Sequence, residues 1–232
     1  MLKNEKYCAF IADIVDSTKM ETHKRHNVQD KLQMAVDEYN IKYEASIAAK
    51  LYFSSGDQLQ ALFINAHDAY KFACDFREKM YPIQFRIGLG IGDWSLCFPG
   101  DNTNKQDGTS YHRARKAYEH VKKHNKNIVV NSERDIDAYI NALIAQEYAI
   151  FESQSQKQKE VFAEYKIMYP ICPIIKKESD IASIYVDKGS QKAIAEKVGT
   201  SRQNINKHVQ AGSIYGQRDL QGAIILFLND IF

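Results

Sequence analysis

The chain lacks long apolar runs and clustered cysteines, and each absence excludes a class of protein. Its 232 residues contain no uninterrupted apolar stretch of about 18, the length that a membrane-spanning helix needs. No apolar core of a secretion signal follows Met1–Lys6. We therefore expect a cytoplasmic protein without a membrane partner. The cysteines form no CxxC pair and have no histidine at zinc-ligand spacing, so we expect buried apolar thiols at Cys8, Cys74, Cys97 and Cys172.

The chain as a whole has no large excess of either charge, with 31 basic and 29 acidic residues and a net charge of +2. One segment differs from this average. Between Lys188 and Arg218 there are six basic residues and one acid, Glu196, which gives a net charge of +5. A solvated helix face and a nucleic-acid-binding segment both produce such a run.

The first half of the chain alternates strand-like and helix-like patterns. Its strands outnumber those of a simple repeating βαβ unit, so we expect an α+β fold with a mostly antiparallel sheet and helices on one face. Glycines at 88, 90 and 92 indicate close approach of a backbone or a ligand. The expected strands are 7–14, 50–54, 57–64, 83–92 and 127–130, and the expected helices are 23–47, 66–80 and 110–124.

The second half of the chain has a helical pattern from Asp135 to Met168, typical of a connector or a dimerisation surface. Two prolines in Tyr169–Pro173 interrupt this pattern and indicate a boundary. The expected division is therefore a first domain at 1–131, a helical connector at 132–168 and a helical domain at 169–232.

Two aspartates carry the best indication of chemistry. Asp13 follows an apolar strand pattern, and Asp57 lies in a tight turn between two alternating strands. One such aspartate alone is more often a cap or a turn residue. Two together are typical of a site that holds Mg²⁺ ions against nucleotide phosphates, because Mg²⁺ prefers carboxylate oxygens and takes phosphates and waters as its other ligands.

Four phrases around these aspartates resemble the motifs of the class III nucleotidyl cyclases, in the same order. They are Phe10–Val15, Gly56–Phe63, Phe85–Gly92 and Asp107–Lys116. With the C-terminal segment described below, the chain resembles the bacterial SatD family. The resemblance implies a ferredoxin-like palm domain in which Asp13 and Asp57 share Mg²⁺ or Mn²⁺ and a nucleoside triphosphate binds beside them.

The resemblance also implies roles for other residues. Backbone N–H groups in the turn after Asp13 would face the phosphates, and Phe53 stands where purine cyclases read the base. His112 and Lys116 lie near the positions that stabilise the cyclase transition state, and Arg113 is a further candidate for a phosphate contact. A basic, solvent-facing helix is the other interpretation of these three residues. The turn residues are Ile14, Val15, Asp16, Ser17 and Thr18, of which Asp16 replaces a usual glycine.

The segment Gln191–Val209 has the layout of a DNA-reading helix-turn-helix, with Gly199 in the turn. A helical hairpin used for protein contacts is the alternative. In a DNA reader the second helix would face the bases through Ser201, Arg202, Gln203 and Asn206, with Lys207 on phosphate. Reading of paired half-sites and the cyclase resemblance both favour a homodimer.

The combined hypothesis is a transcription regulator that binds a nucleotide with Mg²⁺ in one domain and DNA in the other. An active nucleotide cyclase or oligonucleotide synthase, controlled by the helix-turn-helix, is the alternative. A palm domain kept only as a dimerisation scaffold is a third possibility, which the intact Asp13 and Asp57 disfavour.

Overall fold

A computed structural model describes residues 6–94, 107–124, 126–168 and 188–232 of the chain. These residues form two compact units, Met1–Ala142 with Leu228–Phe232, and Leu143–Phe227. The division falls inside helix α4 (Ile136–Ser153) and near the end of helix α9 (Ile214–Ile231). The boundary expected at Tyr169 lies outside the described residues, as do Cys97 and Cys172. Cys8 and Cys74 are buried, as expected.

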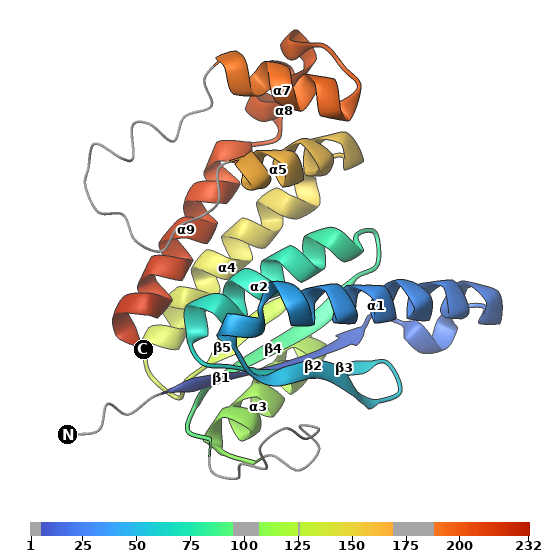
Figure 1. Ribbon diagram of the computed structural model, residues 1–232. Helices are drawn as coiled ribbons and strands as arrows, with labels where there is room; N and C mark the ends of the chain where they lie inside the picture. The colour runs from blue at the N-terminus through green and yellow to red at the C-terminus, as the bar shows by residue number, and fades with distance from the viewer. Residues whose placement is uncertain (1–5, 95–106, 125, 169–187) are drawn as a thin grey trace. The chain divides into compact units, whose positions relative to one another are not determined.

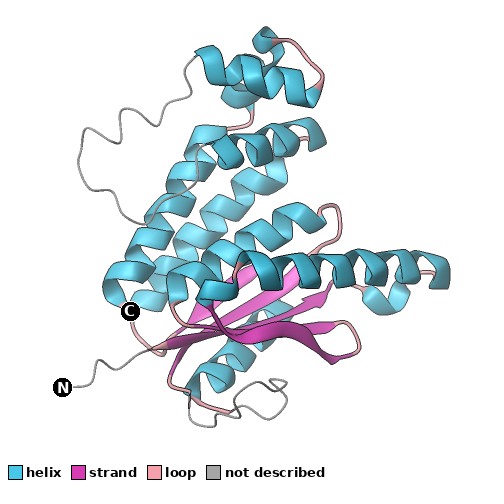
Figure 2. Cartoon of the chain, viewed as in Figure 1, coloured by secondary structure: helices cyan, strands magenta, loops and turns pink. Residues whose placement is uncertain are grey.

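The first unit is built on a five-stranded sheet (Figure 2). The strand order is β2-β3-β1-β4-β5, in which the first four strands are antiparallel and β5 is parallel to β4. The first six long elements follow the β-α-β-β-α-β succession of ferredoxin-like folds. The α+β fold with a mostly antiparallel sheet is therefore confirmed. The elements are β1 (Tyr7–Ile14), α1 (Thr22–Lys42), β2 (Ile47–Ser55), β3 (Gln58–Phe63), α2 (Ala66–Met80), β4 (Phe85–Gly92), α3 (Thr109–His124) and β5 (Ile128–Asn131).

Helices α1 and α2 cover one face of the sheet, and an aromatic core fills the space beneath them (Figure 1). Phe10 of β1 meets Phe72 of α2 edge to face, with ring centroids 5.0 Å apart. Phe76 meets Phe85 of β4 in the same way at 4.9 Å. Edge-to-face packing of this kind adds to the stabilisation that burial of the rings provides. Tyr39 of α1 joins the cluster at 5.3 Å from Phe72.

Helix α3 packs on the opposite face, where alternate glycines of β4 admit it (Figure 1). A side chain at Gly88 would overlap the backbone of Ala114 and Tyr118, and one at Gly90 the backbone of Ser110 and Ala114. The expected close approach of a backbone is thus confirmed. The expectation that helices cover one face only is wrong, because these glycines make the second face just as suitable for a helix.

Asparagine side chains bind both edge strands of the sheet. Asn40 of α1 accepts from the backbone N–H of Leu51 at 2.8 Å and donates to its carbonyl at 2.9 Å. Asn141, near the start of α4 (Ile136–Ser153), makes the same pair of bonds with Val130, both at 2.8 Å. Each amide therefore takes the place of a neighbouring strand at one residue of an edge.

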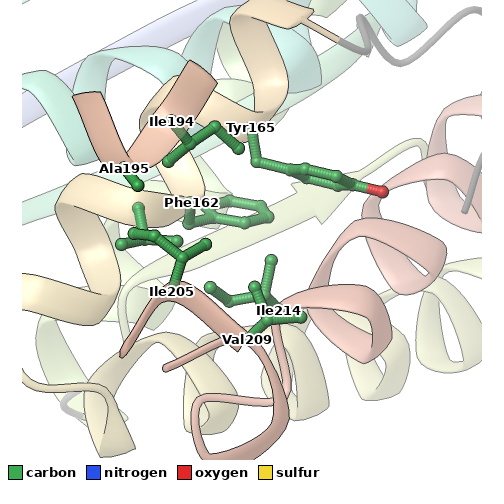
Figure 3. Packing of buried hydrophobic residues seen from close by; sticks show 8 residues of the cluster. Phe162, Tyr165, Ile194, Ala195, Ile205, Val209 and Ile214 are labelled. Carbon is green, nitrogen blue, oxygen red and sulfur yellow. The ribbon is translucent and has the colours of Figure 1, made fainter. Parts of the chain in front are cut away.

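The second unit is helical and has its own core (Figure 3). Beside the end of α4 it contains α5 (Gln156–Met168), α7 (Lys188–Val198), α8 (Arg202–Ala211) and most of α9 (Ile214–Ile231). The helical pattern from Asp135 to Met168 therefore belongs to two helices rather than one. The core residues come from α5, α7, α8 and the start of α9, and are Val161, Phe162, Tyr165, Ile194, Ala195, Ile205, Val209 and Ile214.

None of the helices within the described ranges is long and apolar enough to span a membrane.

Candidate functional site

Asp13 and Asp57 lie at the same end of the neighbouring strands β1 and β3. Asp13 is next to last in β1 and pairs with Arg86 of β4, while Asp57 comes immediately before β3. The register of the central strands sets Ala12 opposite Leu59, so the end of β1 is level with the start of β3. The negative charge of Asp57 acts on Asp13 and helps to raise the pKa of its carboxyl.

One oxygen of the Asp13 carboxylate is held by two neighbours. The Tyr118 hydroxyl of α3 donates to Oδ2 at 2.7 Å, and the Arg86 guanidinium lies 3.5 Å from the same atom. Burial is the largest influence on this carboxyl and raises its pKa, whereas Tyr118, Arg86 and Lys122 lower it. Burial also raises the pKa of the Tyr118 phenol, so this hydroxyl remains a donor at neutral pH.

The other oxygen of Asp13 and one oxygen of Asp57 are buried without a hydrogen-bond partner in the part of the chain that the structure describes. Buried polar atoms normally have a partner, and carboxylate oxygens of this kind are suitable ligands for a divalent cation. No group of three or more histidine, cysteine or acidic side chains that could hold a metal occurs among the described residues. Two carboxylates alone are a donor set that suits Mg²⁺, which takes phosphates and waters as its other ligands.

The turn after Asp13 begins with residues already engaged in the fold. Ile14 is buried, and the Val15 N–H donates to the Gln84 carbonyl at 2.9 Å. Asp16 adopts a left-handed backbone, with φ of 56°, and its side chain forms an exposed ion pair with Lys19 at 3.2 Å. Asp16 is the residue that stands where the cyclase motif usually has glycine.

The rest of this turn is a short 3-10 helix, Ser17–Lys19. The Lys19 N–H donates to the Asp16 carbonyl at 2.9 Å and the Met20 N–H to the Ser17 carbonyl at 3.2 Å. The N–H groups of Asp16, Ser17 and Thr18 stay outside these bonds. Such consecutive N–H groups can bind an anion.

Phe53 and its neighbour Tyr52 lie on opposite faces of β2. Phe53 pairs with Leu59, which pairs with Ala12, so these residues share the face opposite to Asp13. Tyr52 pairs with Gln60 and donates from its hydroxyl to the Gln60 Oε1 at 3.1 Å. The face that carries Asp13 therefore presents Tyr52 and Gln60, an assignment that requires the register of β1, β3 and β2.

Arg113 and Lys116 of α3 bind Glu133, which follows β5, and not Asp13 or Asp57. Arg113 donates to the Ile91 carbonyl at 2.7 Å and to Glu133 at 3.2 Å, and Lys116 donates to Glu133 at 2.6 Å. The Lys116 hydrogen bond is the main reason why the pKa of Glu133 is lowered. His112 is exposed and lies 3.2 Å from Asp107.

These three residues are distant from Asp13 within one chain. Ile91 pairs with Cys8, five residues before Asp13, which corresponds to about 17 Å along a strand. The cations that act on Asp13 are instead Arg86 and Lys122. Arg86 and Tyr118 were not predicted from the sequence as neighbours of Asp13. Arg86 lies on the same face of β4 as Gly88 and Gly90. This alternation places Arg86 near Asp13 only once β4 is known to pair with β1.

Helix α8 and its N-cap residue carry the residues expected to contact DNA. Gly199 adopts φ of 68° in the turn, and the Ser201 hydroxyl caps α8 by accepting from the Asn204 N–H at 3.2 Å. Ile205 and Val209 of α8 face the core. The five expected contact residues are all exposed, namely Ser201, Arg202, Gln203, Asn206 and Lys207.

The sequence pattern of the SatD family matches residues 7–219. The chain belongs to the SatD family. This SatD protein has no match among curated proteins. Solved structures similar to it include a microbial GGDEF domain that interacts with bis-(3′,5′)-cyclic di-GMP, at 15% identity and a TM-score of 0.39, over 56% of this chain and 80% of that one.

A bacterial light-regulated adenylyl cyclase is similar to the SatD protein at 12% identity and a TM-score of 0.36, over 54% of this chain and 74% of that one. A second structure of a bacterial light-regulated adenylyl cyclase has 12% identity and a TM-score of 0.32, over 54% of this chain and 42% of that one.

Proposed function

We propose that this SatD protein is a regulator that binds a nucleoside triphosphate with Mg²⁺ or Mn²⁺ in a cyclase-like first unit and DNA in the second. The observation that carries the nucleotide part is the pair of buried carboxylate oxygens without partners, Asp13 Oδ1 and Asp57 Oδ2. A divalent cation between them would satisfy both oxygens and would neutralise charge on the phosphates.

The residues around the pair divide the binding task. Asp13 and Asp57 hold the cation, and the N–H groups of Asp16, Ser17 and Thr18 face phosphate oxygens. Arg86, whose guanidinium lies 3.5 Å from Asp13 Oδ2, supplies further positive charge beside the phosphates. Phe53 was expected at the position that reads the base. Tyr52 and Gln60, which are polar and share the face of Asp13, contact the nucleotide instead.

A thermal unfolding titration tests nucleotide binding. ATP, GTP, CTP and UTP are each added with Mg²⁺ to the wild type, to Asp57→Asn and to a control, Asp107→Asn. The control removes an exposed aspartate that pairs with His112. The correct nucleotide at 100 times its Kd should stabilise the wild type by about 2.7 kcal/mol and leave Asp57→Asn nearly unchanged. No shift with any of the four nucleotides would contradict the proposal.

The DNA part of the proposal rests on α8, whose apolar residues are buried while five polar or basic ones are exposed. A second helix of this kind enters the major groove with its first residues at base edges. Selection of duplexes from a randomised pool would identify a preferred sequence. Arg202→Ala should then relax the preference at one position by about 1–3 kcal/mol, and Lys207→Ala should weaken binding to all sequences and reduce the salt slope by about one.

A charge control keeps the DNA test specific. Lys123→Ala removes an exposed lysine from α3 in the first unit and should leave the selected duplex bound as in the wild type. Equal weakening by Lys123→Ala and Lys207→Ala would mean that general charge, and not α8, holds the DNA. In that case the helical-hairpin alternative, with a protein partner, would be favoured.

An active nucleotide cyclase or oligonucleotide synthase is the second candidate function, favoured by the intact carboxylate pair. Within one chain Arg113 and Lys116 are bound to Glu133, so a catalytic role for them and for His112 requires a homodimer that brings a second copy of α3 to the aspartates. Pyrophosphate release from labelled triphosphates with Mn²⁺, present in the wild type and lost in Asp57→Ala, would support catalysis. Equal release from both would contradict it.

A further inference from the structure

The contact between Tyr118 and Asp13 joins residues 105 positions apart in the sequence. Tyr118 lies on α3, one helical turn after Ala114, on the stripe that packs on the glycines of β4. Gly88 is the glycine beneath Tyr118, since a side chain there would come within 2.9 Å of the Tyr118 Cα. The glycine therefore lets α3 approach the sheet closely enough for the phenol to reach Asp13.

We infer that Tyr118 is a positioning residue that holds Asp13 Oδ2 and thereby keeps Oδ1 available to a divalent cation. This inference rests on the proposed metal site. It adds a role for a residue outside the four motifs of the first unit.

The hydrogen bond divides the carboxylate into two unequal oxygens. Oδ2 receives the phenol at 2.7 Å and the Arg86 guanidinium at 3.5 Å, whereas Oδ1 is buried and has no partner among the described residues. A short bond from a neutral donor fixes the side-chain rotamer without adding a positive charge that would repel a metal ion. Partners of this kind orient metal-binding carboxylates in many proteins.

Arg86 determines the direction of the expected effect. Its distance of 3.5 Å from Oδ2 leaves room for a closer contact once the phenol no longer occupies that oxygen. A carboxylate free to rotate could then offer both oxygens to the guanidinium in a bidentate pair. Without the Tyr118 hydroxyl, both oxygens of Asp13 should bind Arg86. Fewer oxygens would then be available to a metal ion, and metal binding should weaken.

The test measures Mn²⁺ binding to the full chain by electron paramagnetic resonance of the free ion, without nucleotide and without turnover. Tyr118→Phe keeps the ring, so its packing on the sheet is retained. Removal of an outer hydrogen-bond partner typically weakens metal binding 10–100-fold, so we expect the Kd for Mn²⁺ to rise by roughly that factor. Tyr111→Phe removes a phenol from the same helix one heptad earlier and should leave the Kd unchanged.

Two further variants separate the inference from the function on which it rests. Asp57→Asn should abolish Mn²⁺ binding, and in an Asp13→Asn background Tyr118→Phe should have no additional effect. If the wild type binds Mn²⁺, Asp57→Asn does not, and Tyr118→Phe binds as tightly as the wild type or more tightly, the positioning role is wrong while the metal site stands. If Asp57→Asn binds as the wild type does, or neither binds, the metal site is wrong and the inference falls with it.

Discussion

Gly90 shows how much of this site depends on the absence of a side chain. Any Cβ there would overlap the backbone of Ser110 and Ala114. Gly90→Ala should therefore force α3 away from the sheet and lower the free energy of unfolding by about 3 kcal/mol, the upper end of the usual cost of overpacking. Denaturant unfolding followed by circular dichroism measures this loss.

Gly56 supplies a matched control for that prediction. It adopts φ of 58° in the β2–β3 turn, but a Cβ there would meet nothing within 4 Å. Gly56→Ala should cost only about 1 kcal/mol, from backbone strain alone. Equal losses in the two variants would mean that α3 is not held against β4 by this contact.

His67, in the first turn of α2, makes stability depend on pH. Its pKa is lowered, first by burial and then by Lys71, while Asp68 opposes the shift. The unfolded chain therefore takes up a proton before the folded one as the pH falls below about 6.5, and the folded state loses stability in that range. His67→Gln should lose less stability than the wild type between about pH 7.5 and pH 5.5. Parallel curves for the two proteins would contradict this.

At the scale of elements, the start of α8 depends on one hydroxyl. Ser201 caps the helix by accepting from the Asn204 N–H. Ser201→Ala should destabilise the second unit by about 1 kcal/mol, whereas Ser201→Gly should cost only a few tenths. Thermal unfolding of both variants checks this order, and a glycine variant less stable than the alanine variant would show that the cap is not the cause.

The sequence predicted well those elements whose signals are local. The β2–β3 hairpin was expected around Ser55-Gly56, and Gly56 indeed takes the left-handed backbone that such a turn requires. The first long helix was expected to reach Ile47 but ends at Lys42; a 3-10 helix, Glu44–Ser46, follows, and Ile47 is the first residue of β2. An apolar residue at helical spacing does not by itself distinguish the end of a helix from the start of a strand.

The break between α4 and α5 had a sequence signal that was not used. Ser155 and Gln158 form a reciprocal cap, in which the Ser155 N–H donates to the Gln158 side chain at 2.7 Å and the Gln158 N–H to the Ser155 hydroxyl at 3.3 Å. A serine followed by glutamine three residues later is the capping-box pattern of a helix start. This pattern marks where the helical region expected from Asp135 to Met168 divides into α4 and α5.

The candidate site could be predicted only in part. Asp13 and Asp57 stand in local motifs, so the sequence singled them out, and the register of β1 and β3 puts them at the same end of these two strands. Arg86 and Tyr118 act on Asp13 only because β4 lies beside β1 and α3 crosses both strands. Contacts of this kind depend on tertiary packing, for which a single sequence carries no pattern.

At the scale of the whole molecule, a homodimer that shares its catalytic residues makes a quantitative prediction. If pyrophosphate release is found, Asp57→Ala and Lys116→Ala should each be inactive alone. Co-refolding them in equal amounts should restore about a quarter of the wild-type rate, because half of the dimers are mixed and each mixed dimer keeps one intact site. If the mixture of the two variants is as inactive as each variant alone, Asp57 and Lys116 do not form a site shared between two chains.

The asparagine bonds to the two edge strands have a consequence for how copies of this protein can associate. Leu51 and Val130 already satisfy their outward backbone groups through Asn40 and Asn141. A strand from another chain would have to displace these amides before it could extend the sheet. Growth into edge-to-edge fibrils is therefore opposed at both edges of the sheet, and association of copies is directed to helix surfaces.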